Sequence, residues 1–169
     1  WDYTNLIHSL NIRGIEEFDM LQRAFMGGFT HANAMYADET LSDVTSYDFT
    51  SSYPTVMIAE QFPMSSGVRV EVKSTKQFEF LISKYCCIFD VEFNNIFATQ
   101  TQDNPISSSK CIIKEHIAEN NGRVVAAKRI VMTITNVDYD IIKNFPAKWA
   151  GSLKLILPAK NNIALTALY

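Results

Sequence analysis

Residues 120–135 read Asn-Asn-Gly-Arg-Val-Val-Ala-Ala-Lys-Arg-Ile-Val-Met-Thr-Ile-Thr. Asn121-Gly122 favours the tight turn of a β-hairpin, because both residue types tolerate positive φ. Apolar residues alternate with polar ones before the turn, and β-branched residues are frequent after it. We therefore predict two antiparallel strands joined at this turn.

Helical and strand patterns follow one another irregularly in the rest of the chain. Apolar spacing and turn residues predict helices over residues 16–26, 53–61, 75–85 and a short one through Ile142. Phe18, Leu21 and Phe25 share one face of the first helix, Thr75 caps the third, and Asn136 or Asp138 caps the last. Strands are predicted over residues 43–49, 68–72, 86–93 and 152–157. The polar residues 99–109 predict a mobile surface loop. This order indicates an α+β fold with mostly antiparallel strands.

The composition is that of an ordinary globular protein. The chain has 169 residues, of which 47% are hydrophobic and 20% charged, which suits one domain or one large domain with a small lobe. No apolar run is long enough to cross a membrane, and the first residues are not a signal peptide, so we expect a cytoplasmic protein. Because the sequence starts with Trp1, we expect a piece of a longer protein. The three cysteines form no CxxC pair, which favours small buried thiols over a zinc site or a disulfide.

Charge is unevenly distributed along the chain. Residues 1–92 hold 6 basic and 13 acidic groups, whereas residues 93–169 hold 9 basic and 5 acidic groups. The second part could face phosphates while the first binds cations. An ordinary solvated surface with uneven clusters of charge explains the same numbers.

The residues Asp48-Phe49-Thr50-Ser51-Ser52-Tyr53-Pro54 carry most of the functional information. The predicted strand places the carboxylate of Asp48 at its carboxyl end, and the predicted helix brings hydroxyl groups and the ring of Tyr53 within the next turn. We expect Asp48 and Tyr53 to face one cleft that binds a divalent cation and a sugar. The simpler alternatives are a turn cap at Asp48, N-cap roles for Ser51 and Ser52, and packing at Tyr53.

Several other classes of site lack the residues they need. The three histidines fit no HExxH pattern, no serine lies in a Gly-x-Ser-x-Gly elbow, and neither a dinucleotide fingerprint nor a P-loop lysine occurs. Asp48 and Glu60 have no reason to converge as a glycosidase pair. Zinc hydrolases, serine hydrolases and nucleotide-binding α/β folds are therefore disfavoured.

The Asp-x-x-Ser-x-Tyr-Pro pattern at Asp48 to Pro54 resembles motif A of family B DNA polymerases, and in particular the protein-primed branch of phages and linear plasmids. Upstream, Arg23 to Thr30 resembles that family's Tyr-x-Gly-Gly segment. Downstream, residues 87–96, 135–138 and 141–143 resemble the insertion that follows motif A in this branch. The resemblance spans residues 20–150 and implies a partial polymerase palm, with an antiparallel sheet and helices, plus a small α/β insertion lobe.

The resemblance also implies roles for individual residues. Asp48 would be one of two catalytic carboxylates that bind Mg²⁺, with the Phe49 backbone carbonyl as a further ligand; hard oxygen ligands suit this ion. Tyr53 would stack under the sugar and exclude a 2′-hydroxyl. Ser51 and Ser52 would contact the nucleotide or primer. The residues implied to contact the template strand are Phe25, Gly27 and Gly28.

Two departures from the family pattern limit these implications. Phe25 stands where the family has the first tyrosine of Tyr-x-Gly-Gly, and Gly27-Gly28 would also serve simply to end a helix. The sequence contains neither a Tyr-x-Asp-Thr-Asp-Ser motif nor the family's Lys-x-x-x-Asn-Ser-x-Tyr-Gly motif. One aspartate cannot build a two-metal site, so we expect the piece to be inactive alone and to bind Mg²⁺ weakly.

The domain division and the partners follow from the same resemblance. Residues 1–64 would start the palm with the Gly-Gly segment and motif A, and residues 65–169 would form the insertion that docks the terminal protein and return toward the palm. The implied partners are DNA, a deoxynucleoside triphosphate, the priming terminal protein and the remaining polymerase domains, without a membrane. The alternative is a stand-alone interaction module that binds protein or nucleic acid without catalysis.

Overall fold

The structure is a computed structural model that describes residues 3–28, 30, 32–60, 62–98, 104–144, 149–155 and 164–166. The chain divides into two compact units. The first contains Trp1–Met26 and Pro63–Tyr169, and the second contains Gly27–Phe62. The first unit holds the sheet and the hydrophobic core.

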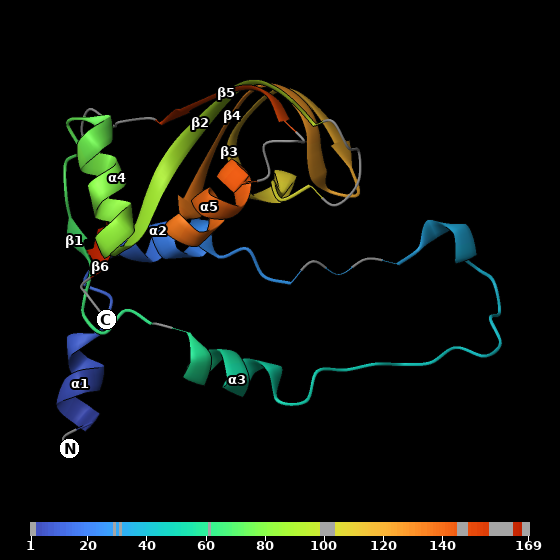
Figure 1. The fold of residues 1–169 in the computed structure, drawn as a ribbon, viewed down its shortest axis with the longest axis horizontal. Coiled ribbons are helices and arrows are strands. Elements are labelled where there is room, and N and C mark those ends of the chain that lie inside the picture. The colour runs from blue at the N-terminus through green and yellow to red at the C-terminus, as the bar shows by residue number, and fades with distance from the viewer. Residues whose placement is uncertain are drawn as a thin grey trace. The chain divides into compact units, whose positions relative to one another are not determined.

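A six-stranded sheet dominates the first unit (Figure 1). Its strand order is β1-β6-β2-β4-β3, and β5 also pairs with β2. Every pairing is antiparallel. The strands are β1 (Val68–Arg69), β2 (Cys86–Ala98), β3 (Cys111–Asn120), β4 (Arg123–Thr135), β5 (Trp149–Leu155) and β6 (Ala164–Thr166). The predicted α+β class with antiparallel strands is therefore confirmed.

The hairpin predicted at Asn121-Gly122 joins β3 to β4. Asn120 pairs with Arg123 across the turn. Both turn residues have positive φ, 48° at Asn121 and 69° at Gly122. This is the conformation that Asn-Gly supplies at low cost in a two-residue hairpin loop. Local turn chemistry thus sets the register of β3 against β4 next to the turn.

The main core lies on one face of β2 and β4. Along β2 the buried side chains first occupy odd positions, up to Phe93, and then even positions, beginning at Ile96. The change occurs at Asn95, whose φ is +50°, and the pairing with β5 shifts register between Asn94 and Phe97. A β-bulge here keeps apolar side chains on the core face as the strand bends.

Two helices, α4 (Thr75–Lys84) and α5 (Asn136–Asn144), cover this core face. The Phe78 ring of α4 packs edge-to-face on Phe89 of β2 with 4.9 Å between ring centroids. The Tyr139 ring of α5 contacts the same Phe78 ring at 5.5 Å. Both predicted helices are present, and their packing joins three separate segments of the chain around one aromatic cluster.

The helix α2 (Ile15–Ala24) covers the opposite face of the sheet. Met20 and Ala24 are buried there, outside the main core cluster. Asp90 and Thr133 face each other across β2 and β4 on this side, because neighbouring strand residues point to opposite faces. The face that α2 buries is not the one shared by Phe18 and Leu21, whose side chains remain exposed.

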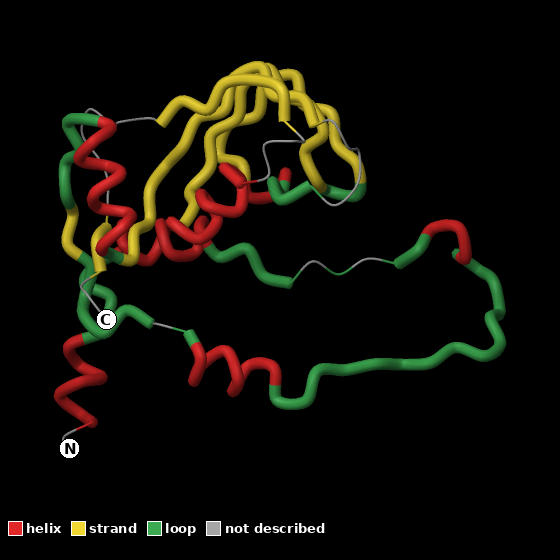
Figure 2. The backbone as a smooth tube through the Cα atoms, in the orientation of Figure 1, coloured by secondary structure: helices red, strands yellow, loops and turns green. Residues whose placement is uncertain are grey.

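The second unit contains little regular structure (Figure 2). Its elements are the 3₁₀ helix η1 (Ala34–Tyr36) and the helix α3 (Ser52–Ala59). The predicted helix 53–61 is therefore present over most of its length. The predicted strand over residues 43–49 is wrong, because this stretch pairs with no strand in the described part of the chain.

Other predictions were wrong in detail. Residues 99–103 lie outside the described part of the chain, but Asn104, Ile106 and Ser108 are buried, and the 3₁₀ helix η2 (Ser108–Lys110) follows them. This part of the predicted surface loop is instead fixed by two backbone hydrogen bonds to the β3–β4 hairpin, Ser108 N to Gly122 O and Val124 N to Ile106 O, each 3.0 Å.

Element ends also differ from the sequence-based expectations. The side chain of Ser74, not Thr75, caps α4 by accepting a hydrogen bond from Gln77 N. The predicted strand 68–72 is reduced to β1, and the predicted strand 152–157 begins earlier, at Trp149. The sequence patterns predicted neither α1 (Tyr3–Ser9) nor β6. Among the described residues, no helix combines the length and apolar character needed to span a bilayer.

Candidate functional site

The Asp48–Pro54 motif lies in the second unit, at the start of α3. Ser51 occupies the N-cap position in a left-handed conformation, with φ 55° and ψ 39°, and its carbonyl accepts a hydrogen bond of 2.9 Å from Thr55 N. Its side chain makes no capping hydrogen bond. A left-handed residue other than glycine costs about 1–2 kcal/mol, so the turn before α3 is a strained point in the backbone.

The carboxylate and the aromatic rings of the motif are open to solvent. Asp48 Oδ1 accepts a hydrogen bond of 2.8 Å from Phe49 N. The Phe49 side chain is 85% exposed and that of Tyr53 is 84% exposed. Every side chain of Gly27–Phe62 whose burial is described is exposed. The second unit therefore does not by itself form the cleft that we expected Asp48 and Tyr53 to share.

The oxygen donors at Asp48 suit a hard cation, but they are too few to form a metal site. A carboxylate and the Phe49 backbone carbonyl are the type of ligand that Mg²⁺ prefers, and this ion takes octahedral coordination. Among the described residues, no group of three His, Cys, Asp or Glu side chains is placed to hold a metal ion. The segment could supply part of the coordination shell of a metal ion, and other ligands would have to complete it.

The Phe25–Gly28 segment follows directly after α2. The Phe25 ring is 70% exposed and lies under Lys110, whose Nζ is 5.8 Å from the ring centroid. Gly27 has a φ of +66°, which explains a glycine there. At Gly28 an added Cβ would meet no atom within 4 Å. Gly27 therefore has a local conformational role, whereas Gly28 leaves open space beside the backbone.

A charged ladder, which sequence reasoning did not identify, crosses the sheet on the α2 face. Arg129 of β4 forms ion pairs of 2.9 Å with Glu92 of β2 and with Glu115 of β3. The hydrogen bonds to Glu115 and then to Glu92 raise the pKa of Arg129 above its ordinary value. The only sequence signal was the i, i+2 spacing of Asp90 and Glu92, which places both on one strand face.

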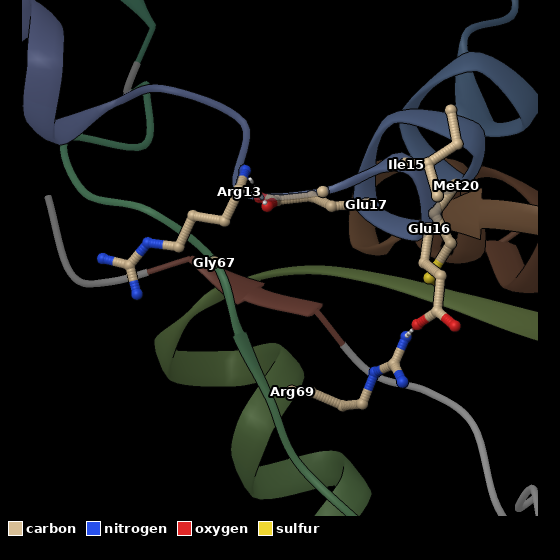
Figure 3. A pocket seen from close by; sticks show the side chains of 8 residues that line it. Arg13, Ile15, Glu16, Glu17, Met20, Gly67 and Arg69 are labelled. Carbon is tan, nitrogen blue, oxygen red and sulfur yellow. Dashed lines mark hydrogen bonds and ion pairs between the residues drawn. The ribbon is translucent and has the colours of Figure 1, made fainter.

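A pocket of about 420 Å³ lies beside the N-terminus of α2. Figure 3 shows the Arg69 guanidinium directed at the Glu16 carboxylate, 2.8 Å away, while Glu17 accepts a hydrogen bond from Arg13 N. Two arginines and two glutamates line the pocket, so their charges balance. None of the residues predicted for the functional site lines it.

Comparisons with known proteins identify the family. The family model described as DNA polymerase type B, organellar and viral, matches residues 5–149. The DNA polymerase of Bacillus phage B103 is 26% identical over 125 residues, which cover 73% of this chain and 20% of that polymerase. The DNA polymerases of Bacillus phages Nf and M2 are each 24% identical over 125 residues, with the same coverage. No solved structure matches the chain.

The family match includes every segment on which the resemblance was based, from Arg23 to Thr30 and Asp48 to Pro54 through residues 141–143. The predicted resemblance to family B polymerases, including those of phages, is confirmed. The chain spans about a fifth of the length of these curated relatives. The family model matches well over half of this chain, residues 5–149, and the chain therefore belongs to the type B DNA polymerases of organelles and viruses.

Proposed function

We propose that this chain is the part of a protein-primed, DNA-directed DNA polymerase that carries motif A and the insertion after it. The family match over residues 5–149 is the observation that carries this proposal. The structure adds that the residues after motif A build an antiparallel sheet with its own core. In this proposal, residues 1–64 contribute to the palm, and residues 65–169 include the insertion that docks the terminal protein.

Within the intact polymerase, Asp48 would supply one of the carboxylates that hold Mg²⁺, and the Phe49 carbonyl would be an auxiliary ligand. When bound, the ion stabilises charge on the transferred phosphoryl group. Tyr53 would pack against the sugar of the incoming deoxynucleoside triphosphate, and Ser51 and Ser52 would contact the nucleotide or primer. Their exposure in the second unit leaves these side chains accessible to such ligands.

The chain alone is expected to be catalytically inactive. The sequence contains no Tyr-x-Asp-Thr-Asp-Ser motif, which would bring the second catalytic aspartate, and the described residues bring no carboxylate cluster together. In a two-metal mechanism two ions stabilise the attacking and the leaving oxygen, so the protein must supply ligands for both ions. We infer that the remaining carboxylate comes from another polymerase domain, and that the isolated chain binds Mg²⁺ weakly.

The proposed partners follow from the same assignment. Template and primer DNA, a deoxynucleoside triphosphate and a terminal protein would bind the intact polymerase in the cytoplasm of its host cell. Phe25, Gly27 and Gly28 would lie along the template strand. Gly27 has a positive φ, which supports the need for a glycine at this position of the Gly-Gly segment, since only glycine adopts that conformation without cost.

Substitution of Asp48 by Asn in the full-length polymerase tests the proposed metal ligand. We expect nucleotide incorporation with Mg²⁺ to fall by more than about 100-fold, because loss of a direct ligand should exceed the cost of losing an outer-shell partner. Asp43→Asn is the matched control, since Asp43 is another exposed aspartate of the same unit. Asp43 has a positive φ, which asparagine tolerates. Equal activity of the Asp48 variant and the wild type would favour a non-catalytic interaction module.

Replacement of Tyr53 by Val tests sugar selection in the same enzyme. We expect ribonucleotide incorporation relative to deoxynucleotide incorporation to rise by about 10-fold or more, the usual scale for removing a steric barrier in a pocket. Tyr47→Val is the control, because the Tyr47 side chain is 90% exposed and lies outside the motif. An unchanged ratio in the Tyr53 variant would remove this residue from the site.

A further inference from the structure

We propose that Thr133 is a positioning residue for Phe25, the first residue of the proposed template segment Phe25–Gly28. Its hydroxyl joins Arg23 of α2 to Asp90 of β2 and so holds the end of α2 on the sheet that follows motif A. The inference rests on the proposed function of that segment. Its physical part, the attachment of α2 to the sheet, can be tested separately.

The hydrogen-bonded chain is complete on both sides of the hydroxyl. Arg23 Nε donates to Thr133 Oγ1 at 3.0 Å, and Thr133 Oγ1 donates to Asp90 Oδ1 at 2.6 Å. Thr133 is 0% exposed, while Arg23 and Asp90 are half-buried. One hydroxyl group therefore accepts from a cation and donates to an anion at once, an arrangement in which both hydrogen bonds are charge-assisted.

The hydroxyl matters because its two partners come from distant parts of the chain. Arg23 and Thr133 are 110 residues apart, and Asp90 and Thr133 are 43 residues apart. A valine at position 133 would keep the shape of threonine but would leave a half-buried guanidinium and a half-buried carboxylate without this bridge. Unpaired charged groups at such a site are costly.

A second group from the sheet unit holds the same helix end. Lys110 Nζ donates to the backbone carbonyl of Gln22 at 3.4 Å and lies over the Phe25 ring. Gln22 belongs to the last turn of α2, where carbonyls have no partner within the helix and the helix dipole favours a positive charge. Lys110 thus satisfies a carbonyl and contacts the aromatic side chain at the start of the template segment.

The contacts continue along the chain as far as Met26. Met26 packs against the main hydrophobic core, and Gly27 begins the second unit with its positive φ. Helix ends otherwise fray, because their last residues have few partners. The first unit therefore holds the chain from the last turn of α2 as far as Met26.

Hydrogen exchange in the full-length polymerase tests the attachment. In Thr133→Val we expect exchange of peptides that contain the last turn of α2 to rise by about 10-fold, the effect of losing a hydrogen bond to a charged group. Thr133→Ser keeps the hydroxyl and should restore protection. Thr135→Val is the matched control, because it removes another threonine hydroxyl of β4, one that donates to Asp138 Oδ2 of α5 at 2.7 Å.

Template binding by the same variants tests positioning. We expect Thr133→Val to raise the Kd for primer-template DNA by about 10-fold, with incorporation at saturating DNA within about 2-fold of wild type and with rescue by Thr133→Ser. In a Gly28→Ala background, Thr133→Val should add little, because both changes act on one segment.

The possible failures have different meanings. Unchanged exchange at the end of α2 in Thr133→Val would overturn the proposed attachment. Raised exchange with an unchanged Kd for DNA would overturn the positioning role while leaving the polymerase assignment intact. A wild-type protein that does not bind primer-template DNA would overturn the proposed function of the segment, and with it the positioning role.

Discussion

At the scale of single residues, burial has its clearest chemical effect on two thiols. Burial raises the pKa of Cys87 to about 12, with a smaller contribution from Cys86. Burial also raises the pKa of Cys111 to about 11, against the opposing effect of Lys114. Within the described part of the chain none of the three cysteines forms a disulfide, and Cys86 is half-buried. The prediction of small buried thiols is confirmed for Cys87 and Cys111.

Thiol alkylation at pH 8 should therefore be selective. The thiolate fractions of Cys87 and Cys111 at that pH are on the order of 10⁻⁴ and 10⁻³, so we expect Cys86 to react first. Mass spectrometry of labelled peptides would measure the order, and Cys86→Ser should remove the fast phase. A fast phase that persists in Cys86→Ser would show that the buried thiols are accessible.

The same pKa values set the direction of a pH effect on stability. The folded-state pKa of each buried thiol lies above the ordinary value of 9.0, so the folded state keeps protons that the unfolded state releases. These two thiols should therefore favour folding fully below pH 9 and lose that contribution progressively as the pH rises toward 11 and 12.

At the scale of elements, local capping and turn chemistry decide where strands and helices meet. Thr135 ends β4 and caps α5: its N–H donates to Asp138 Oδ2 at 3.0 Å, and Asp138 N donates back to Thr135 Oγ1 at 3.2 Å. The helix was predicted to be capped by Asn136 or Asp138. Instead Thr135 is the N-cap residue, and Asp138 takes part as its partner at the third helical position of a capping box. The pattern Thr-x-x-Asp could have identified it.

The β3–β4 turn offers a direct measurement at this scale. We expect Gly122→Ala to lower the free energy of unfolding by about 1–2 kcal/mol, because an L-residue is strained at positive φ. No atom lies within 4 Å of the added Cβ, so the cost should come from the backbone alone. Gly122→Asn should cost less, since asparagine tolerates this conformation. Equal urea midpoints for the alanine variant and the wild type would contradict the observed turn.

At the scale of the whole molecule, the two units differ in how they bury side chains. The first has one core built from α4, β2, β4 and α5. The second exposes every side chain whose burial is described, including large apolar ones: Tyr47, Phe49, Tyr53 and Ile58 are each more than 80% exposed. Large exposed apolar surfaces mark interaction sites, which agrees with the proposal that motif A functions among other polymerase domains.

Substitutions in the two units should therefore have unequal effects on stability. Phe78 is 1% exposed at the centre of the aromatic cluster, and Phe78→Ala should lower the free energy of unfolding by about 3–5 kcal/mol. Ile58→Ala is the matched control; its side chain is 87% exposed, and a change within about 0.5 kcal/mol is expected. Urea unfolding of both variants measures the difference. Similar losses would show that Ile58 is packed.

The sequence by itself determined the features that depend on neighbours a few residues apart. The Asn121-Gly122 turn, the four predicted helices, the antiparallel class and the motif at Asp48 were all predicted from spacing and residue type. The motif also led to the correct family. Turn geometry and helical periodicity act within a few residues, so they can be recognised without knowing the rest of the fold.

Only the tertiary structure decided which distant segments meet. Residues 43–49 were predicted as a strand but pair with none of the strands that the structure describes, and a strand exists only through its partners. Ile106 has polar neighbours along the sequence, yet its side chain is fully buried. Its backbone carbonyl accepts a hydrogen bond from Val124 N, which holds this segment on the hairpin. The bridge from Arg23 through Thr133 to Asp90 spans 110 residues. Such contacts depend on how the sheet is ordered and which face each helix covers, and no local pattern encodes either.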